Sequence, residues 1–176
     1  KTFLLRKVCA DANLSFLWLN GEDDEVSKIL QTQNSANFKR LVGDRALLVI
    51  DEAQSVPNIG KALKLMVDEI PHLRLLVSGS SAFDLHNRLG EPLVGRAFWH
   101  ELLPIAQMEL KSHENALETR QRLAERLIFG SYPEVVTLER FDQKERYLRD
   151  LTQAYLLKDI LALEGIRNAS KILDLL

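Results

Sequence analysis

The sequence predicts an α/β fold, with a parallel sheet flanked by helices and a small helical region after it. Over residues 1–104, short apolar segments that end in turn residues alternate with segments of helical apolar spacing. Residues 46–50 form a continuous apolar run, as strands buried on both faces of a parallel sheet do. After Pro104 the apolar spacing is helical throughout. We therefore expect an α/β domain over residues 1–104 and a helical region over residues 105–176.

The first domain opens with a helix. Apolar residues recur at helical spacing over residues 2–12, which predicts an amphipathic helix there. Residues 14–19 are rich in aromatic and apolar side chains and end at Asn20-Gly21, which is typical of a short strand stopped by a turn. The same criteria predict the remaining elements in this order: surface helices over 22–33 and 37–41, the buried strand over 46–50, a helix over 58–70, a strand over 73–77, a short helix over 82–89 and a strand over 97–103.

The second domain is expected to contain helices only. Apolar residues at helical spacing predict helices over residues 116–129, 143–163 and 169–176. Gly130-Ser131-Tyr132-Pro133 interrupts this pattern, because glycine and proline end helices.

Composition and charge limit the class of protein, although local basic patches remain compatible with them. The 23 basic and 25 acidic residues leave a net charge of −2 on 176 residues, so the chain lacks the basic excess typical of proteins that bind the phosphate backbone of nucleic acids. The single cysteine, Cys9, rules out an internal disulfide and a zinc site built mainly from cysteines. No apolar run approaches the roughly 18 to 20 residues of a membrane helix, and the N-terminus has no signal-peptide pattern. We expect a cytoplasmic protein without a membrane segment.

Two acids follow the buried strand. Asp51 and Glu52 come directly after residues 46–50, at the carboxyl end of a strand that we place in the centre of the sheet. Ligands of open parallel sheets bind at this edge. A carboxylate there can hold Mg²⁺, directly or through water, and a second one can orient or deprotonate a nucleophilic water. The alternative is that the two acids only begin a loop and cap the next helix, so the surrounding motifs must decide.

Lys1-Thr2 stands at the head of the first helix. A phosphate-binding loop ends in Gly-Lys-Ser/Thr, in which the lysine reaches the β- and γ-phosphates and the hydroxyl binds Mg²⁺. The dipeptide alone carries little weight. The order of the motifs carries more, because Lys1-Thr2 precedes a helix, Asp51-Glu52 follows one strand and Ser78-Gly79-Ser80 follows the next. Together these segments predict one nucleotide site.

Motifs along nearly the whole chain occur in the order of a known family. The most specific of them are Asp51-Glu52-Ala53-Gln54, Ser78-Gly79-Ser80-Ser81 and Ser131-Tyr132-Pro133-Glu134. Weaker ones are Lys1-Thr2-Phe3-Leu4-Leu5, Leu93-Val94-Gly95-Arg96 and Tyr155-Leu156-Leu157-Lys158-Asp159-Ile160. The ordered set resembles the prokaryotic AAA+ P-loop ATPases that are often labelled archaeal-type. The resemblance implies a P-loop NTPase-like sheet followed by a helical, lid-like region.

The same resemblance implies roles at the nucleotide site. Lys1 and Thr2 look like the last two residues of the Walker A motif, with Thr2 as a ligand of Mg²⁺. Asp51 looks like the Walker B carboxylate that binds the metal, and Glu52 looks like the residue that activates water. The implied cofactors are ATP and Mg²⁺.

Three further residues occupy positions that matter in such ATPases. Ser78 and Ser80 lie where the family places a polar sensor near the γ-phosphate. Arg96 stands just before the last expected strand, from which related ATPases offer an arginine finger to a neighbouring subunit of a homo-oligomer. A guanidinium there would offset charge on the transferred phosphoryl group. The alternative for Arg96 is an ordinary surface salt bridge.

The match to the family stops at both ends of the chain. No glycine-rich loop stands before Lys1, although the backbone N–H groups of such a loop would cradle the phosphates, and the strand that would lead into it is also missing. Family members usually continue past the helical part into a winged-helix-like segment and a further domain. We therefore expect the 176 residues to be the interior of a longer ATPase, truncated at the Walker A motif and at the C-terminus.

Two functions are consistent with these features. The first is a Mg²⁺-dependent core that binds and hydrolyses ATP, in which Glu52 orients the attacking water and the helical region transmits a conformational change. The second is a non-catalytic or nucleotide-gated module that holds a protein or DNA partner through regions outside this chain. The presence of both Asp51 and Glu52 favours the first function. The target that hydrolysis would drive is not encoded in any of these motifs.

Overall fold

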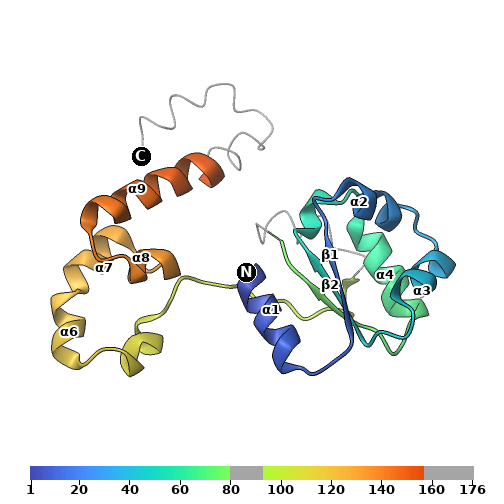
Figure 1. Cartoon of the computed structure of the whole chain (residues 1–176), viewed down its shortest axis with the longest axis horizontal. Helices are drawn as coiled ribbons and strands as arrows, with labels where there is room; N and C mark the ends of the chain where they lie inside the picture. Colours follow the sequence, from blue (N-terminus) through green and yellow to red (C-terminus); the bar gives the residue numbers. More distant parts are fainter. Residues whose placement is uncertain (80–92, 157–176) are drawn as a thin grey trace. The chain divides into compact units, whose positions relative to one another are not determined.

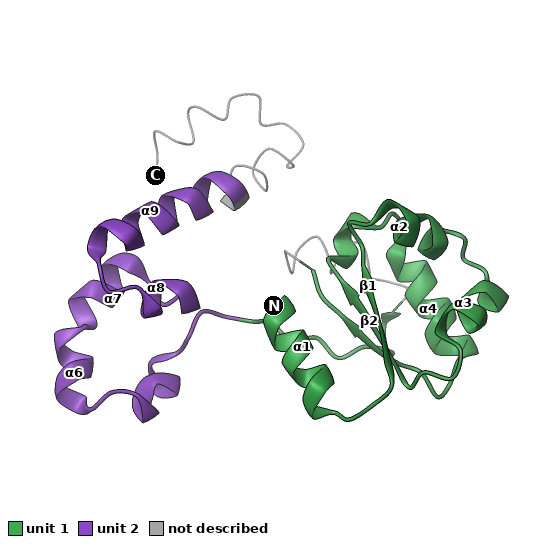
Figure 2. Ribbon diagram, in the orientation of Figure 1, with its two compact units in different colours: residues 1–102 green, residues 103–176 purple. Residues whose placement is uncertain are grey.

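The structure, a computed structural model, describes residues 1–79 and 93–156. The chain divides into two units, Lys1–Leu102 and Leu103–Leu176 (Figure 2). The helices predicted over residues 82–89 and 169–176 lie outside the described residues, as does the last part of the helix predicted over residues 143–163. The assignment of residues 1–104 to a nucleotide-binding core and of residues 105–176 to a lid-like region stays a prediction.

The first unit contains a parallel sheet of three strands. Within the described residues the strands lie in the order β1-β2-β3, with the bounds Phe16–Asn20, Leu47–Asp51 and Arg74–Val77. Asn20 at the end of β1 pairs with Asp51 at the end of β2. The carboxyl ends of parallel strands share one edge of a sheet, so the residues that follow the three strands are brought close together. The predicted α/β architecture with a parallel sheet is confirmed.

Helices cover both faces of this sheet (Figure 1). One face carries α1 (Thr2–Asp11), which packs through Leu5 and Cys9. The other face carries three helices, whose bounds are α2 (Asp24–Gln31), α3 (Ser35–Val42) and α4 (Ile59–Glu69). The sheet is therefore the middle layer of the first unit.

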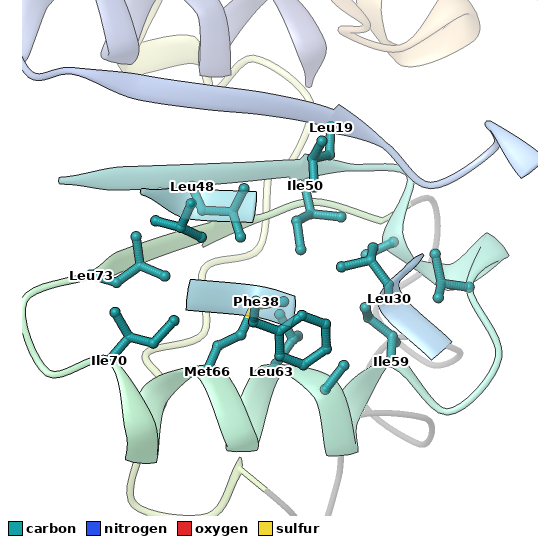
Figure 3. Packing of buried hydrophobic residues seen from close by; sticks show 14 of the residues in the cluster. Leu19, Leu30, Phe38, Leu48, Ile50, Ile59, Leu63, Met66, Ile70 and Leu73 are labelled. Atoms are coloured by element: carbon teal, nitrogen blue, oxygen red, sulfur yellow. The ribbon is translucent and has the colours of Figure 1, made fainter. Parts of the chain in front are cut away.

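The central strand β2 contributes side chains to the packing on both faces. Leu48 and Ile50 point toward the three-helix face, where they belong to the same buried cluster as Leu63 of α4 (Figure 3). Successive side chains of a strand alternate between faces, so Leu47 and Val49 pack with α1 on the opposite face. All five residues of β2 are buried, as the continuous apolar run of the sequence predicted.

Side-chain caps determine where two of these helices begin. The carboxylate of Asp23 accepts hydrogen bonds from two backbone N–H groups in the first turn of α2, and the amide oxygen of Asn34 does the same for α3. Such caps satisfy N–H groups that have no partner within the helix. They explain why α2 begins later, and α3 earlier, than apolar spacing alone predicted.

The prediction of a strand over residues 97–103 is wrong. These residues are irregular and pair with no strand of the described chain. Phe98 is 95% exposed and Leu103 is 67% exposed. A strand needs a neighbour that takes up its backbone hydrogen bonds, and the apolar composition that suggested this strand carries no information on pairing.

The second unit is helical in its described part. Its elements are, in chain order, the 3₁₀ segment η3 (Gln107–Ser112), α6 (Ala116–Gln121), α7 (Leu123–Phe129), α8 (Pro133–Thr137), α9 (Phe141–Leu151) and the π-helical turn η4 (Thr152–Leu156). The helix predicted over residues 116–129 is two helices, because Arg122 adopts φ −85° and ψ −3° between them. Gly130, with φ 74°, ends α7. Nowhere in residues 1–79 or 93–156 does a helix have the length and apolar character needed to cross a membrane.

Candidate functional site

Asp51 lies at the edge where the strands end, and both of its carboxylate oxygens are engaged. Its side chain is buried, with 5% of the residue exposed. The hydroxyl of Thr2 donates a hydrogen bond of 2.8 Å to Oδ2, and the hydroxyl of Ser78 donates one to Oδ1. Such partners offset the cost of burying a charged group. Three segments that are far apart in the sequence therefore converge on one carboxylate.

The amino-terminal end of α1 faces this carboxylate. Thr2 is the first residue of the helix, so its hydrogen bond to Asp51 brings the positive end of the helix dipole to the sheet edge. Lys1 precedes the helix and reaches the residue after Ser78, because its Nζ donates a hydrogen bond of 2.6 Å to the carbonyl oxygen of Gly79. A lysine and a helix amino terminus together favour binding of an anion, and phosphate is the common one.

Glu52 adopts an unusual backbone conformation. Its φ of 53° and ψ of 42° lie in the left-handed region, which residues other than glycine rarely adopt. The turn is anchored to the end of β3, because the N–H of Ala53 donates a hydrogen bond of 2.9 Å to the carbonyl oxygen of Ser78. The half-buried Glu52 carboxylate accepts a hydrogen bond of 2.6 Å from Nε2 of Gln54. Strained residues cluster at functional sites, so this geometry marks Glu52 as a candidate.

Gly21 completes the backbone of the site, although the sequence analysis treated it only as a turn residue. Its N–H donates a hydrogen bond of 2.7 Å to the carbonyl oxygen of Asp51. A Cβ atom at this position would stand 2.4 Å from the carbonyl oxygen of Glu52. Only glycine allows this approach of two backbone segments. The sequence shows only that the glycine directly follows an expected strand, and its role depends on the parallel pairing of that strand with β2.

The oxygens of Thr2 and Asp51 suit a magnesium ion. Octahedral Mg²⁺ binds its ligands at roughly 2.1 Å, which places neighbouring ligand oxygens about 3 Å apart. The 2.8 Å between Thr2 Oγ1 and Asp51 Oδ2 is close to that spacing. Among residues 1–79 and 93–156, no cluster of three or more His, Cys, Asp or Glu residues is placed to hold a metal. Two protein oxygens leave the remaining positions of an octahedral shell to waters and ligand phosphates, which is how Mg²⁺ is commonly held.

Two predicted site residues are not part of this convergence. Arg96 pairs with Asp68, with 2.8 Å between Nε and Oδ1, and both side chains are partly exposed. Asp68 lies in the last turn of α4, which connects two parallel strands and therefore ends at the sheet edge opposite Asp51. Ser80 lies outside the described residues. The ion pair of Arg96 agrees with the alternative of a surface salt bridge, and it leaves the predicted arginine finger untested.

Comparisons with known proteins divide the chain in two. A family model described as an AAA domain matches residues 1–111, and a model described as a domain of unknown function matches residues 120–176. An uncharacterised protein, MJ1544 of Methanocaldococcus jannaschii, is 24% identical over 170 residues, which cover 89% of this chain and 38% of that protein. The chain therefore spans well under half the length of this relative. No solved structure matches the chain.

Proposed function

The chain belongs to the AAA-domain family, and from that premise we propose that it is the ATP-binding and ATP-hydrolysing core of an AAA-type ATPase. The observation that carries the proposal is the engagement of Asp51 by Thr2 and Ser78, beside Lys1 and Glu52, at the carboxyl edge of a parallel sheet. Ligands of such sheets bind at that edge. A cytoplasmic location is part of the same hypothesis.

Each residue at the edge has a role that its chemistry supports. Thr2 and Asp51 would hold Mg²⁺, which supplies positive charge to the phosphates when it is bound. Lys1, at the start of α1, would add a second positive charge. Its ammonium group would exchange the hydrogen bond to the Gly79 carbonyl oxygen for one to a phosphate.

Glu52 is the proposed activating residue for hydrolysis. Its carboxylate would orient a water for in-line attack on the γ-phosphorus and accept the proton that the water loses, while the bond from the γ-phosphorus to the bridging oxygen breaks and ADP leaves. Ser78 holds the neighbouring Asp51 in place through its hydroxyl, and its role as a polar sensor near the γ-phosphate stays a prediction. The role of Ser80 as a second sensor stays a prediction.

The test uses the natural protein that contains this chain. Glu52→Gln should preserve ATP affinity, measured by titration with a fluorescent ATP analogue, and lower the rate of phosphate release by about 10²- to 10⁴-fold, because the water loses its general base. Asp51→Asn should weaken Mg²⁺-dependent binding. A matched control is Glu69→Gln, which alters an exposed ion pair with Lys39 and should leave both properties unchanged.

The same experiment separates the alternatives. Retained phosphate release in Glu52→Gln would remove Glu52 from the mechanism. ATP binding without hydrolysis in the unmodified protein would support a nucleotide-gated module for a protein or DNA partner. The absence of ATP binding would overturn the proposal as a whole.

Arg96 is proposed to act on the site of a second copy of the chain. Its ion pair with Asp68 places it at the sheet edge opposite Asp51, so it would serve a neighbour rather than its own site. Mixing Arg96→Ala protein with Glu52→Gln protein tests this proposal. If Arg96 acts in trans, mixed assemblies contain sites with an intact Glu52 and an intact neighbouring Arg96, and part of the activity returns. If the activity of the mixture equals the sum of the activities of the two variants measured separately, Arg96 does not act on a neighbouring site.

A further inference from the structure

We propose that Gln54 is a positioning residue for Glu52, which its side-chain amide holds in the orientation needed for attack by water. This inference rests on the proposed ATPase function, and it adds a residue to which the resemblance assigned no role. Gln54 Nε2 donates a hydrogen bond of 2.6 Å to Oε2 of Glu52. The carboxylate only accepts hydrogen bonds, so the amide must turn its NH₂ group toward it.

The backbone that carries Gln54 is firmly held. Gln54 is the middle residue of the 3₁₀ turn η1 (Ala53–Ser55). Ala53, directly before it, and Val56, two residues after it, have no exposed surface. Ala53 donates to the carbonyl oxygen of Ser78 at 2.9 Å, and Val56 donates to the carbonyl oxygen of Ala53 at 3.0 Å. The backbone from which the Gln54 side chain extends is therefore anchored to the core of the protein.

Glu52 needs such a partner because of its own backbone. Its left-handed conformation directs the side chain away from the path that a regular strand or helix would give it. A glutamate side chain has three rotatable bonds, and ordering them costs conformational entropy. A hydrogen bond from an amide carried by a held turn restricts that freedom before the nucleotide binds. The bond uses one acceptor site on Oε2, and the carboxylate keeps further sites, those of Oε1 included, for the hydrogen of the attacking water.

A neutral amide suits this task better than a charged group. Lysine or arginine at position 54 would form an ion pair with the Glu52 carboxylate and make it a weaker proton acceptor. A second carboxylate at position 54 would repel the Glu52 carboxylate. Glutamine orients the group and preserves its negative charge. The structural alternative is that Gln54 only stabilises η1, in which case its loss would affect folding rather than turnover.

The first measurement compares two substitutions in the natural protein that contains this chain. Gln54→Met keeps an unbranched side chain of similar length and removes the N–H donor. It should lower kcat by about tenfold, the size expected for losing one hydrogen bond to a charged acceptor. KM and the affinity for ATP should stay within about twofold, because the bond acts on the attacking water rather than on the nucleotide. Gln54→Glu adds a like charge and should lower kcat further.

A control and a double variant exclude a merely structural role. Gln31→Met makes the same change on the exposed surface of α2, where the amide bonds to Ser27, and should leave kcat unchanged. In a Glu52→Gln background, Gln54→Met should have no further effect on the residual rate, because the group that it positions is already disabled. A residue that only supports the fold would lower the rate in both backgrounds.

The outcomes distinguish this inference from the proposed function. Absence of ATP hydrolysis in the unmodified protein would overturn the proposed function. Active protein in which Gln54→Met turns over at the normal rate would overturn the role of Gln54 alone. A lower melting temperature with unchanged kcat would assign Gln54 to the turn and would likewise contradict the inference.

Discussion

The hydroxyl of Thr2 lies 2.8 Å from Oδ2 of Asp51, although 49 positions separate the two residues in the sequence. This hydrogen bond joins the start of α1 to the end of β2, and it provides two neighbouring oxygens of the kind that Mg²⁺ binds. It also satisfies a buried carboxylate. The same contact therefore contributes to stability and to the proposed chemistry, and these two contributions can be separated.

Thr2→Val should destabilise the protein and weaken Mg²⁺-dependent nucleotide binding. The substitution keeps the branched shape but leaves Asp51 Oδ2 without its donor, which costs about 1 to 3 kcal/mol for a buried acceptor. The free energy of unfolding from urea titration measures the first effect, and ATP titration at varied Mg²⁺ measures the second. Thr2→Ser retains the hydroxyl and is the matched control. Equal behaviour of the two variants would show that the hydrogen bond does not matter.

Gly21→Ala should disturb the backbone of Asp51 and Glu52, which Gly21 contacts from the end of β1. The added Cβ would stand 2.4 Å from the carbonyl oxygen of Glu52, so one of two backbone segments must move. We expect a loss of roughly 1 to 3 kcal/mol in the free energy of unfolding, together with lower ATPase activity. The control is Gly95→Ala, where φ is +72° but nothing lies within 4 Å of the new atom. If both variants lose the same stability, the close approach at Gly21 is not the cause.

The sheet could be predicted from the sequence because burial and pairing coincide in β2. A run of apolar residues before Asp51 indicates a strand that is covered on both faces, and the helical segments on either side supply the cover. Residues 97–103 show the limit of that reasoning. They are also rich in apolar side chains, but a strand requires a partner, and pairing between distant segments leaves no local signal.

The candidate site was predictable to the extent that it depends on strand ends. Asp51 and Ser78 follow neighbouring parallel strands, so their meeting follows from the topology. Gly21 and Gln54 could not be assigned in this way. The role of Gly21 depends on the register that pairs Asn20 with Asp51, and the role of Gln54 depends on the left-handed turn at Glu52. Neither the register nor the turn is visible in residue spacing.

A buried ion pair in the second unit should respond asymmetrically to substitution. The Lys144 side chain is 5% exposed, and its Nζ donates to Glu125 Oε1 at 2.5 Å and to the carbonyl oxygen of Val135 at 2.8 Å. Glu125→Leu leaves a buried ammonium without its counter-charge and should cost about 2 to 4 kcal/mol in the free energy of unfolding. Lys144→Met should cost less, because Glu125 is 28% exposed and can turn to water. Urea titration of the natural protein measures both values.

The exposed pair between Arg149 and Glu145 provides the comparison for that experiment. Both side chains are 66% exposed, so Glu145→Ala should change the free energy of unfolding by less than about 0.5 kcal/mol. A larger loss for Lys144→Met than for Glu125→Leu would contradict the assignment of the buried ammonium as the costly partner.

The second unit should lose stability in acid through Glu114. The hydrogen bond from Arg126, together with the charges of Arg126 and Arg122 and a hydrogen bond from Thr119, lowers the pKa of this carboxyl below 4.5. A carboxyl whose pKa is lower in the folded state stabilises the fold above its unfolded value, and that contribution disappears as the pH falls through the folded value. Hydrogen exchange of amides in α6 and α7, measured between about pH 5 and pH 3, should show increasing local opening. Glu114→Gln cannot titrate and should remove this pH dependence, whereas Glu118→Gln in the first turn of α6 keeps the pair between Glu114 and Arg126 and should retain it. An unchanged profile in Glu114→Gln would mean that another group governs acid stability.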